Sequence, residues 1–244
     1  MASGLLVREI YSSIQGESTW AGWPCIFVRL TGCDLRCSYC DSVYAFSGGE
    51  CLTVEAVLRE VDRLANSYSE SDRSPRLPLV EITGGEPLLQ TQVNPLMERL
   101  CDSEFTVLLE TSGAHEIRHV DSRVHRIVDL KCPSSGESDR VLLENIDSLR
   151  PTDEVKFVIG TQQDYEWARE MEQRHQLTSI CPVLFSSVAP LTPEQTSPVL
   201  NAVLPDHLSI SRRELVENIL RDKLLVRFQL QMHKFIWPPD QVGV

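Results

Sequence analysis

The sequence predicts an α/β domain with a mainly parallel sheet. Short apolar runs rich in β-branched residues alternate along the chain with amphipathic segments of helical period. The motifs that carry chemistry follow directly after predicted strands, where the loops of parallel sheets usually hold ligands. The chain has 244 residues, enough for one well-buried core, and no internal repeat. We therefore expect a single domain over residues 1–244.

The expected elements alternate in type along the chain. A strand at residues 25–30 precedes a helix at residues 53–66, for which Thr53 is the N-cap. A polar loop with prolines is expected at residues 67–78. Further strands are expected at residues 79–83, 106–110, 127–130, 155–159, 180–185 and 225–230. Further helices are expected at residues 93–102, 162–175 and 211–223, the last opened by a capping box of Ser211 and Glu214.

Composition and charge favour a small-molecule ligand over a nucleic acid. The formal net charge is −12, which repels phosphate backbones, and Lys and Arg form no cluster. No apolar run approaches the roughly 18 residues that a membrane helix needs. The N-terminus lacks the pattern of a secretory signal. We expect a cytoplasmic protein that binds neither nucleic acid nor membrane.

Three of the eight cysteines, Cys33, Cys37 and Cys40, have the spacing Cys-x3-Cys-x2-Cys directly after a predicted strand. Thiolates are soft ligands that suit iron–sulfur clusters and zinc. Three ligands leave one iron of a four-iron cluster open, whereas structural zinc sites take four, and no fourth Cys or His follows at a conventional spacing. The pattern favours a cluster, with zinc as the alternative. The other cysteines are expected to be small buried hydrophobes.

Two features together resemble the radical S-adenosylmethionine (SAM) superfamily. An aromatic residue, Tyr39, precedes the last cysteine, and residues 83–87 read TGGEP at the end of a predicted strand. The resemblance implies that Cys33, Cys37 and Cys40 bind one [4Fe–4S] cluster whose open iron binds SAM. It further implies contacts with SAM from Tyr39, Cys40, Asp41 and Gly85.

Further segments resemble one family of that superfamily, 7-carboxy-7-deazaguanine synthase (QueE). They are residues 10–18, 27–33, 129–136, 156–159 and 229–234, which read IYSSIQGES, FVRLTGC, DLKCPSSG, KFVI and QLQMHK. The resemblance implies a radical SAM partial (β/α) barrel and a lyase that converts 6-carboxy-5,6,7,8-tetrahydropterin to 7-carboxy-7-deazaguanine with loss of ammonia. This reaction belongs to the biosynthesis of queuosine and other 7-deazapurines. A homodimer and an electron donor such as flavodoxin or ferredoxin are also implied.

The same resemblance assigns the substrate contacts. The aminopyrimidinone edge of a pterin suits amide and carboxylate groups, and a guanidinium suits the substrate carboxylate. The expected substrate contacts are Ile14, Gln15, Gly16, Glu17, Arg29, Thr83 and His233. Three assignments have open alternatives. The alternative for Arg29 is a structural ion pair, and the alternative for His233 is packing of the tail. For Ser134 and Ser135, which the resemblance places at SAM, the alternative is a polar loop.

Ser42 departs from the family pattern. Members carry Cys-Asp-Thr, whose threonine hydroxyl ligates a magnesium ion, whereas residues 40–42 here read Cys-Asp-Ser. Serine keeps the hard oxygen ligand but loses the methyl group that restricts χ1. We expect Mg²⁺ to bind at Ser42 through a less preorganised ligand.

Two competing functions are weighed against this one. A glycyl-radical-enzyme activating enzyme also carries Cys-x3-Cys-x2-Cys, but the segments at residues 14–17 and 129–136 favour the deazapurine reaction. A zinc- or cluster-binding regulatory module would need a basic surface or a fourth protein ligand, and the sequence has neither.

Overall fold

The computed structural model describes residues 4–69, 76–203, 206–238 and 241–244, and within them nine strands form one sheet. Its order is β3-β1-β2-β4-β5-β6-β7-β8-β9. All strands from β2 to β9 in this order run parallel, and β1 pairs antiparallel with both β2 and β3. The predicted α/β class with a mainly parallel sheet is confirmed.

Most elements lie where the sequence predicts them. The strands are β1 (Leu5–Ile14), β2 (Pro24–Leu30), β3 (Glu50–Leu52), β4 (Leu79–Gly84), β5 (Thr106–Thr111), β6 (His125–Asp129), β7 (Glu154–Ile159), β8 (Val183–Ser187) and β9 (Arg227–Gln229). The helices are α1 (Val54–Asn66), α2 (Val93–Asp102), α3 (Gln162–His175), α4 (Arg212–Asp222) and α5 (His233–Ile236). The predicted caps are confirmed, since the Thr53 hydroxyl accepts from Ala56 N at 3.2 Å and Ser211 forms a capping box with Glu214.

Two predicted strands differ in extent from the structure, and one predicted loop lies partly outside the described residues. The strand expected at residues 180–185 begins only at Val183, because Leu177–Ser179 forms a 3₁₀ turn and Pro182 has no N–H to donate to a neighbouring strand. The strand expected at residues 225–230 is shorter, and β1 and β3 were not predicted. Of the loop expected at residues 67–78, residues 70–75 lie outside the described part of the chain.

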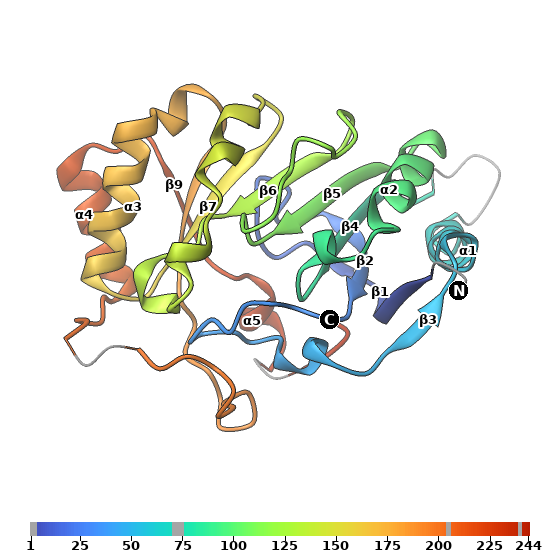
Figure 1. The fold of residues 1–244 in the computed structure, drawn as a ribbon, viewed down its shortest axis with the longest axis horizontal. Coiled ribbons are helices and arrows are strands. Elements are labelled where there is room, and N and C mark those ends of the chain that lie inside the picture. The colour runs from blue at the N-terminus through green and yellow to red at the C-terminus, as the bar shows by residue number, and fades with distance from the viewer. Residues whose placement is uncertain (1–3, 70–75, 204–205, 239–240) are drawn as a thin grey trace.

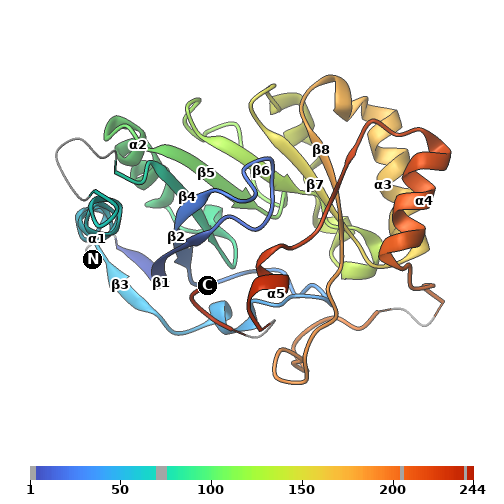
Figure 2. The same cartoon turned by 180° about the vertical axis from the view of Figure 1, so that it is seen from behind.

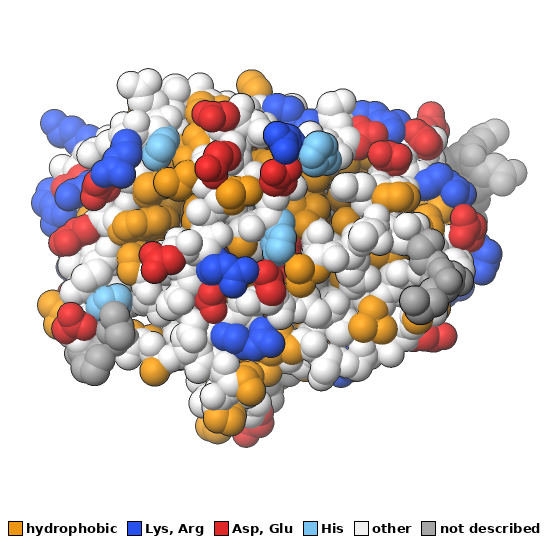
Figure 3. All heavy atoms as spheres, viewed as in Figure 1, with side chains coloured by type: hydrophobic (Ala, Val, Ile, Leu, Met, Phe, Trp, Pro, Cys, Tyr) orange, Lys and Arg blue, Asp and Glu red, His pale blue; other side chains and the backbone are white. Residues whose placement is uncertain are grey.

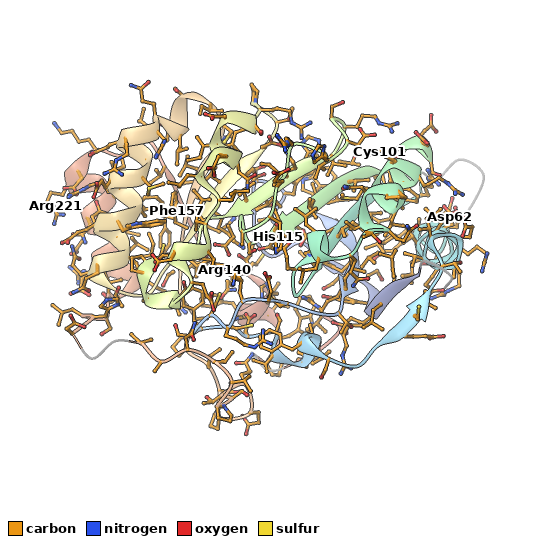
Figure 4. All side chains as sticks on the ribbon, viewed as in Figure 1. Asp62, Cys101, His115, Arg140, Phe157 and Arg221 are labelled. Atoms are coloured by element: carbon orange, nitrogen blue, oxygen red, sulfur yellow. The ribbon has the colours of Figure 1, made fainter. Side chains whose placement is uncertain are left out.

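Helices α1 to α4 cover the outer face of a curved sheet whose edges, β3 and β9, stay apart (Figure 1). Val80 and Ile82 of β4 join the core formed with α1 and α2, whereas Glu81 and Thr83, which alternate with them, face inward. At the other end of the sheet, Phe157 of β7 packs edge-on against Trp167 of α3 (Figure 4). The connection from β5 to β6 contains no helix, and that from β6 to β7 only 3₁₀ turns. The architecture is the predicted partial barrel.

The inner face is closed at the amino ends of the parallel strands. An apolar layer lies there, formed by Cys25, Phe27, Leu79, Leu108 and Ile127 with Tyr11 and Trp20. The β1–β2 loop, residues 15–23, crosses beneath this layer. Within the loop, Thr19 N donates to Glu154 of β7 at 2.9 Å, and Gln229 of β9 donates to Ser18 O at 2.9 Å. Polar groups above this layer therefore face a cavity that opens toward the carboxyl ends.

The surface carries mixed charge. Figure 3 shows Lys and Arg side chains interspersed with Asp and Glu on the face viewed, so no broad basic patch forms there. Across the described ranges, no helix combines the length and the apolar character that crossing a bilayer requires.

Candidate active site

A cavity of about 430 Å³ runs from the carboxyl ends of the strands down the inner face of the sheet. It brings together residues that stand far apart in the sequence. Those predicted as site residues that line it are Ile14, Gln15, Gly16, Glu17, Arg29, Cys33, Cys37, Tyr39, Cys40, Asp41, Ser42, Thr83, Gly85 and His233. The cysteine loop, residues 33–42, is at the end of the cavity formed by the carboxyl ends of the strands. The β1–β2 loop is at the opposite end, near the amino ends of the parallel strands.

The cysteine loop is braced from neighbouring strand ends. Ser38 donates from its backbone N to Ser135 O at 3.0 Å and from its hydroxyl to Ser134 O at 2.6 Å. His115 and Arg140, which follow β5 and β6, both bind the Asp34 carboxylate, at 3.2 and 2.7 Å (Figure 4). These contacts hold the loop over the sheet without using its thiols.

Burial disfavours the thiolate forms of the three cysteines. Burial raises the pKa of Cys37 to about 11 and that of Cys40 to about 12, and it raises the pKa of Cys33 as well. Metal ligation requires thiolates, so loading the site releases protons.

The donor set fits a cluster better than a single ion. Within the described residues, no three His, Cys, Asp or Glu side chains converge tightly enough to hold one metal ion. A cubane cluster binds each cysteine through a different iron, so its thiols stand farther apart than the ligands of one zinc ion. The Tyr39 hydroxyl and Asp129 Oδ1 also line the cavity and are buried without a protein partner, as expected where a polar cofactor binds. In the described part of the chain, zinc, the alternative, therefore has no closed ligand set.

The two glycines of the TGGEP segment let β4 approach the cysteine loop. Gly85 N donates to Leu30 O at 3.1 Å, and Glu86 N donates to Gly32 O at 2.8 Å. A Cβ at Gly85 would lie 2.1 Å from Gly32 O and 2.9 Å from Cys33 Cβ. The fully buried Glu86 carboxylate accepts from Ser112 N at 2.7 Å and so ties the segment to the end of β5. These glycines therefore leave room for the backbone that carries Cys33.

Replacing Gly85 with alanine is expected to reduce cluster occupancy about tenfold or more, because the new methyl group must displace the backbone that carries Cys33. Iron and sulfide content after anaerobic reconstitution measures this, with circular dichroism to show that the variant is folded. A folded Gly85→Ala protein with a full complement of iron would contradict the role of Gly85 in seating the loop.

Lys156 is the centre of a buried polar layer on the inner face. Its side chain is only 4% exposed, and Nζ lies 3.1 Å from Glu17 Oε2 and 3.9 Å from Asp129 Oδ2, with Glu110 in a closer ion pair. Burial acts to raise the pKa of Glu17, but the charges of Lys156 and His233 and the hydrogen bonds from Gln231 and Lys156 together outweigh burial, and the pKa is lowered. Glu17 therefore carries its negative charge into the cavity.

Glu81, which is 2% exposed, forms no ion pair among the described residues and accepts a hydrogen bond from Gln15 Nε2. Burial, followed by the nearby Glu110 carboxylate, raises the pKa of Glu81 well above the usual range, which favours its neutral form. Five charged residues that line the cavity were not predicted from the sequence: Glu81, Glu110, Asp129, Lys131 and Lys156. For Glu81, Glu110, Asp129 and Lys156 the signal was a charged residue within a mostly apolar strand, as in VKFVI around Lys156, whereas Lys131 follows β6.

Arg29 forms the structural ion pair of its alternative interpretation and also lines the cavity. Its Nε lies 2.8 Å from Glu9, and Nη2 donates to the Tyr11 hydroxyl at 2.9 Å, so a structural ion pair exists. The side chain also lines the cavity. A guanidinium has five N–H donors, which leaves Arg29 capacity for a carboxylate ligand.

The carboxyl-terminal segment closes one side of the cavity. Met232 N donates to Gly16 O at 2.9 Å, and a Cβ at Gly16 would lie 2.4 Å from His233 Nδ1. His233 thus packs against Gly16 while it also lines the cavity. The next residue, Lys234, forms an ion pair with Asp41 of the cysteine loop. Burial acts to raise the pKa of Asp41, but the charge and hydrogen bond of Lys234, together with the Ser42 hydrogen bond and the charge of His233, hold it well below its usual range.

Ser134 and Ser135 are not among the residues that line the cavity, which favours the alternative of a polar loop. Both are buried, and the Ser134 hydroxyl donates to Asp164 at 2.5 Å while that of Ser135 donates to Cys132 O at 2.6 Å. Their carbonyls support Ser38, so they stabilise the cysteine loop from below.

The comparison with protein families agrees with this site. Residues 27–171 match the radical SAM superfamily. A partial barrel with Cys-x3-Cys-x2-Cys after its first parallel strand, and a Gly-Gly segment seated against that loop, defines the same class. The protein is therefore a radical SAM enzyme, and the superfamily implies a [4Fe–4S] cluster and SAM as its cofactors.

Curated relatives narrow the class. The chain is 45% identical to 7-carboxy-7-deazaguanine synthase of Koribacter versatilis, over 98% of this chain and 99% of the relative. It is 41% identical to the protein of that name from Chlorobaculum tepidum, over 98% and 97%. The chain belongs to the 7-carboxy-7-deazaguanine synthase family. The crystal structure of QueE from Escherichia coli has the same fold, with a TM-score of 0.68 at 22% identity over 94% of this chain and 95% of the other.

Proposed function

We propose that this enzyme converts 6-carboxy-5,6,7,8-tetrahydropterin to 7-carboxy-7-deazaguanine with loss of ammonia, in queuosine or other 7-deazapurine biosynthesis. The observation that carries the proposal is identity of 45% to a synthase of that name over nearly the whole of both chains. The cavity supports it, because one space joins the cysteine loop to the polar β1–β2 loop. When bound, the cluster and SAM supply the one-electron chemistry that removes a hydrogen atom from the substrate.

The chain's own residues bind and orient the reactants. Cys33, Cys37 and Cys40 hold the cluster, and Gly85 leaves room for the methionine end of SAM. Further SAM contacts come from Tyr39, Cys40 and Asp41. At the end of the cavity near the β1–β2 loop, Gln15, Gly16 and Glu17 bind the aminopyrimidinone edge of the substrate. Ile14, Thr83 and His233 lie beside the ring. Arg29 binds the substrate carboxylate through its remaining N–H groups. The apolar layer below and the carboxyl-terminal segment exclude water from the reacting centre.

Magnesium is the third cofactor of the proposal, with Ser42 as its ligand. Support comes from the position of Ser42 in the cavity lining and from its hydroxyl, which donates to Asp41 Oδ1 at 2.9 Å. This hydrogen bond restricts the rotamer in place of the missing methyl group.

Replacing Ser42 with alanine is expected to raise the Mg²⁺ concentration for half-maximal turnover about tenfold, because a hard oxygen ligand is removed. Ser42→Thr, which restores the methyl group, should equal or exceed the native protein in Mg²⁺ affinity. Full Mg²⁺ stimulation in Ser42→Ala would remove Ser42 from the metal site.

The wider assignments rest on the family resemblance and on composition. We propose a single domain over residues 1–244, since one sheet runs from Leu5 to Gln229. Eight free cysteines support a reducing compartment, hence the cytoplasm. The family resemblance also supports a flavodoxin or ferredoxin as the electron donor. It supports a homodimer as the assembly.

The experiment is anaerobic reconstitution with iron and sulfide, followed by turnover with SAM, dithionite and Mg²⁺. Formation of 7-carboxy-7-deazaguanine is expected. Cleavage of SAM with the pterin untouched would contradict the substrate and favour the glycyl-radical-enzyme activating enzyme. Failure to form any cluster would contradict both.

A further inference from the structure

Lys234 forms a buried ion pair that joins two segments far apart in the sequence. Its side chain is 8% exposed, and it pairs with Asp41, which is 28% exposed. Lys234 belongs to α5, and in both views of the ribbon this short helix lies beside the chain that follows the cysteines (Figures 1 and 2). The proposed chemistry assigns Lys234 no role.

The segment that carries Lys234 is anchored on its other side to the β1–β2 loop. Gln229 donates to Ser18 O at 2.9 Å, and Gln231 donates to Glu17 Oε1 at 3.1 Å. Apolar burial adds little to this anchoring, since Phe235 and Ile236 of α5 are 58% and 53% exposed. The segment therefore contacts the substrate loop through hydrogen bonds and the cysteine loop through Lys234.

Asp41 transmits this contact to the metal-binding end of the cavity. It lies between Cys40 and Ser42, and its Oδ1 accepts from the Ser42 hydroxyl at 2.9 Å. A partly buried carboxylate that loses its cation must turn toward solvent or another cation, since an unpaired buried charge is costly. Either movement would release the Ser42 hydroxyl from its present orientation.

We propose that Lys234 is a positioning residue that links the cysteine loop to the β1–β2 loop through Asp41, so that the two ends of the active site become ordered together. The effect on a metal at Ser42 rests on the proposed function, whereas the link between the two loops does not.

Hydrogen exchange of the reconstituted full-length protein tests the link without turnover. In Lys234→Met, amides of residues 37–44 and 229–236 should exchange about tenfold faster or more, because both segments lose their shared tether. Lys234→Arg keeps the charge and should restore slow exchange in both segments. Lys223→Met is the matched control, since Lys223 is exposed at the end of α4, and it should leave both segments unchanged. Unchanged exchange in α3 shows that the fold persists.

A double-mutant cycle with Asp41→Asn separates the pair from the single side chains. If the link acts through the ion pair, Lys234→Met combined with Asp41→Asn should exchange no faster at residues 37–44 than the faster single variant. Faster exchange in Lys234→Met confined to residues 229–236 would overturn the proposal. So would additive effects in the cycle.

Binding of Mn²⁺ reports separately on Ser42. It is measured from the EPR signal of Mn²⁺, with the pterin present and SAM absent. Weaker binding in Lys234→Met, with rescue in Lys234→Arg, is the expected result. A native protein that binds no Mn²⁺ would contradict the magnesium assignment of the proposed function, while the exchange result would still decide the link.

Discussion

The Cys37→Ala variant is expected to lose the cluster and to lower formation of 7-carboxy-7-deazaguanine at least about 10³-fold. Cys37 is the central cysteine of the motif, 7% exposed, and its thiol lines the cavity. Two remaining thiols cannot hold three irons of a cubane, and the cofactor carries the difficult step of the reaction. The variant should fold, because the loop is held by Ser38, Asp34 and the glycine segment rather than by its thiols.

The measurements are visible absorbance and iron content after reconstitution, then product formation under reducing conditions. Cys51→Ala is the matched control, since Cys51 is exposed on β3 and outside the cavity lining. It should retain iron and turnover. A Cys37→Ala protein with a native iron content would show that the cluster is held elsewhere.

The fold was largely predictable because its signals are local. Thr53 and Ser211 mark helix starts through their own side chains, and the strand runs of the parallel sheet are continuously apolar. β1 was missed because it is antiparallel at one side of the sheet, where only part of the strand is buried. The half-polar sequence of β1 resembles a surface loop. Its pairing with β2 and β3 depends on tertiary contacts that the local sequence does not show.

Cavity-lining residues that belong to a recognisable motif were predicted from the sequence, and those outside such a motif were not. The cysteines, Gly85 and the Gln15–Glu17 stretch all line one cavity as expected. Lys156 and Glu81 lie singly in apolar strands, so their partners become visible only when the sheet brings β4, β5 and β7 together. Ser134 and Ser135 show the converse, since their motif matches the family but the structure turns them toward Asp164 and Cys132.

The Lys156→Met variant is expected to be the most destabilised of the substitutions considered. The change leaves Glu17 and Glu110 in the cavity without their cation, while Asp129 keeps Lys131 at 2.6 Å. Removing one partner of a buried ion pair costs about 3–5 kcal/mol, because the remaining charge is uncompensated. Turnover should fall at least about 10²-fold, since Glu17 would no longer carry a defined charge and position at the substrate. Urea unfolding of the cofactor-free protein measures the first effect.

The dependence on pH distinguishes loss of the cation from loss of packing. In the native protein the pKa of Glu17 is lowered, so its pairing stabilises the fold above the ordinary value of 4.5 and this contribution is lost as the pH falls through the lowered pKa. In Lys156→Met the charge and hydrogen bond of Lys156 are lost, so burial is opposed only by His233 and Gln231 and the pKa of Glu17 rises relative to the native protein. Acidification then neutralises the uncompensated charge at a higher pH. The stability difference between the two proteins should therefore shrink as the pH falls toward 4.5. Glu110→Gln added to Lys156→Met should recover part of the loss at neutral pH, because it removes one uncompensated charge. A difference that stays constant with pH would assign the effect of Lys156 to packing of its methylene chain and not to its charge.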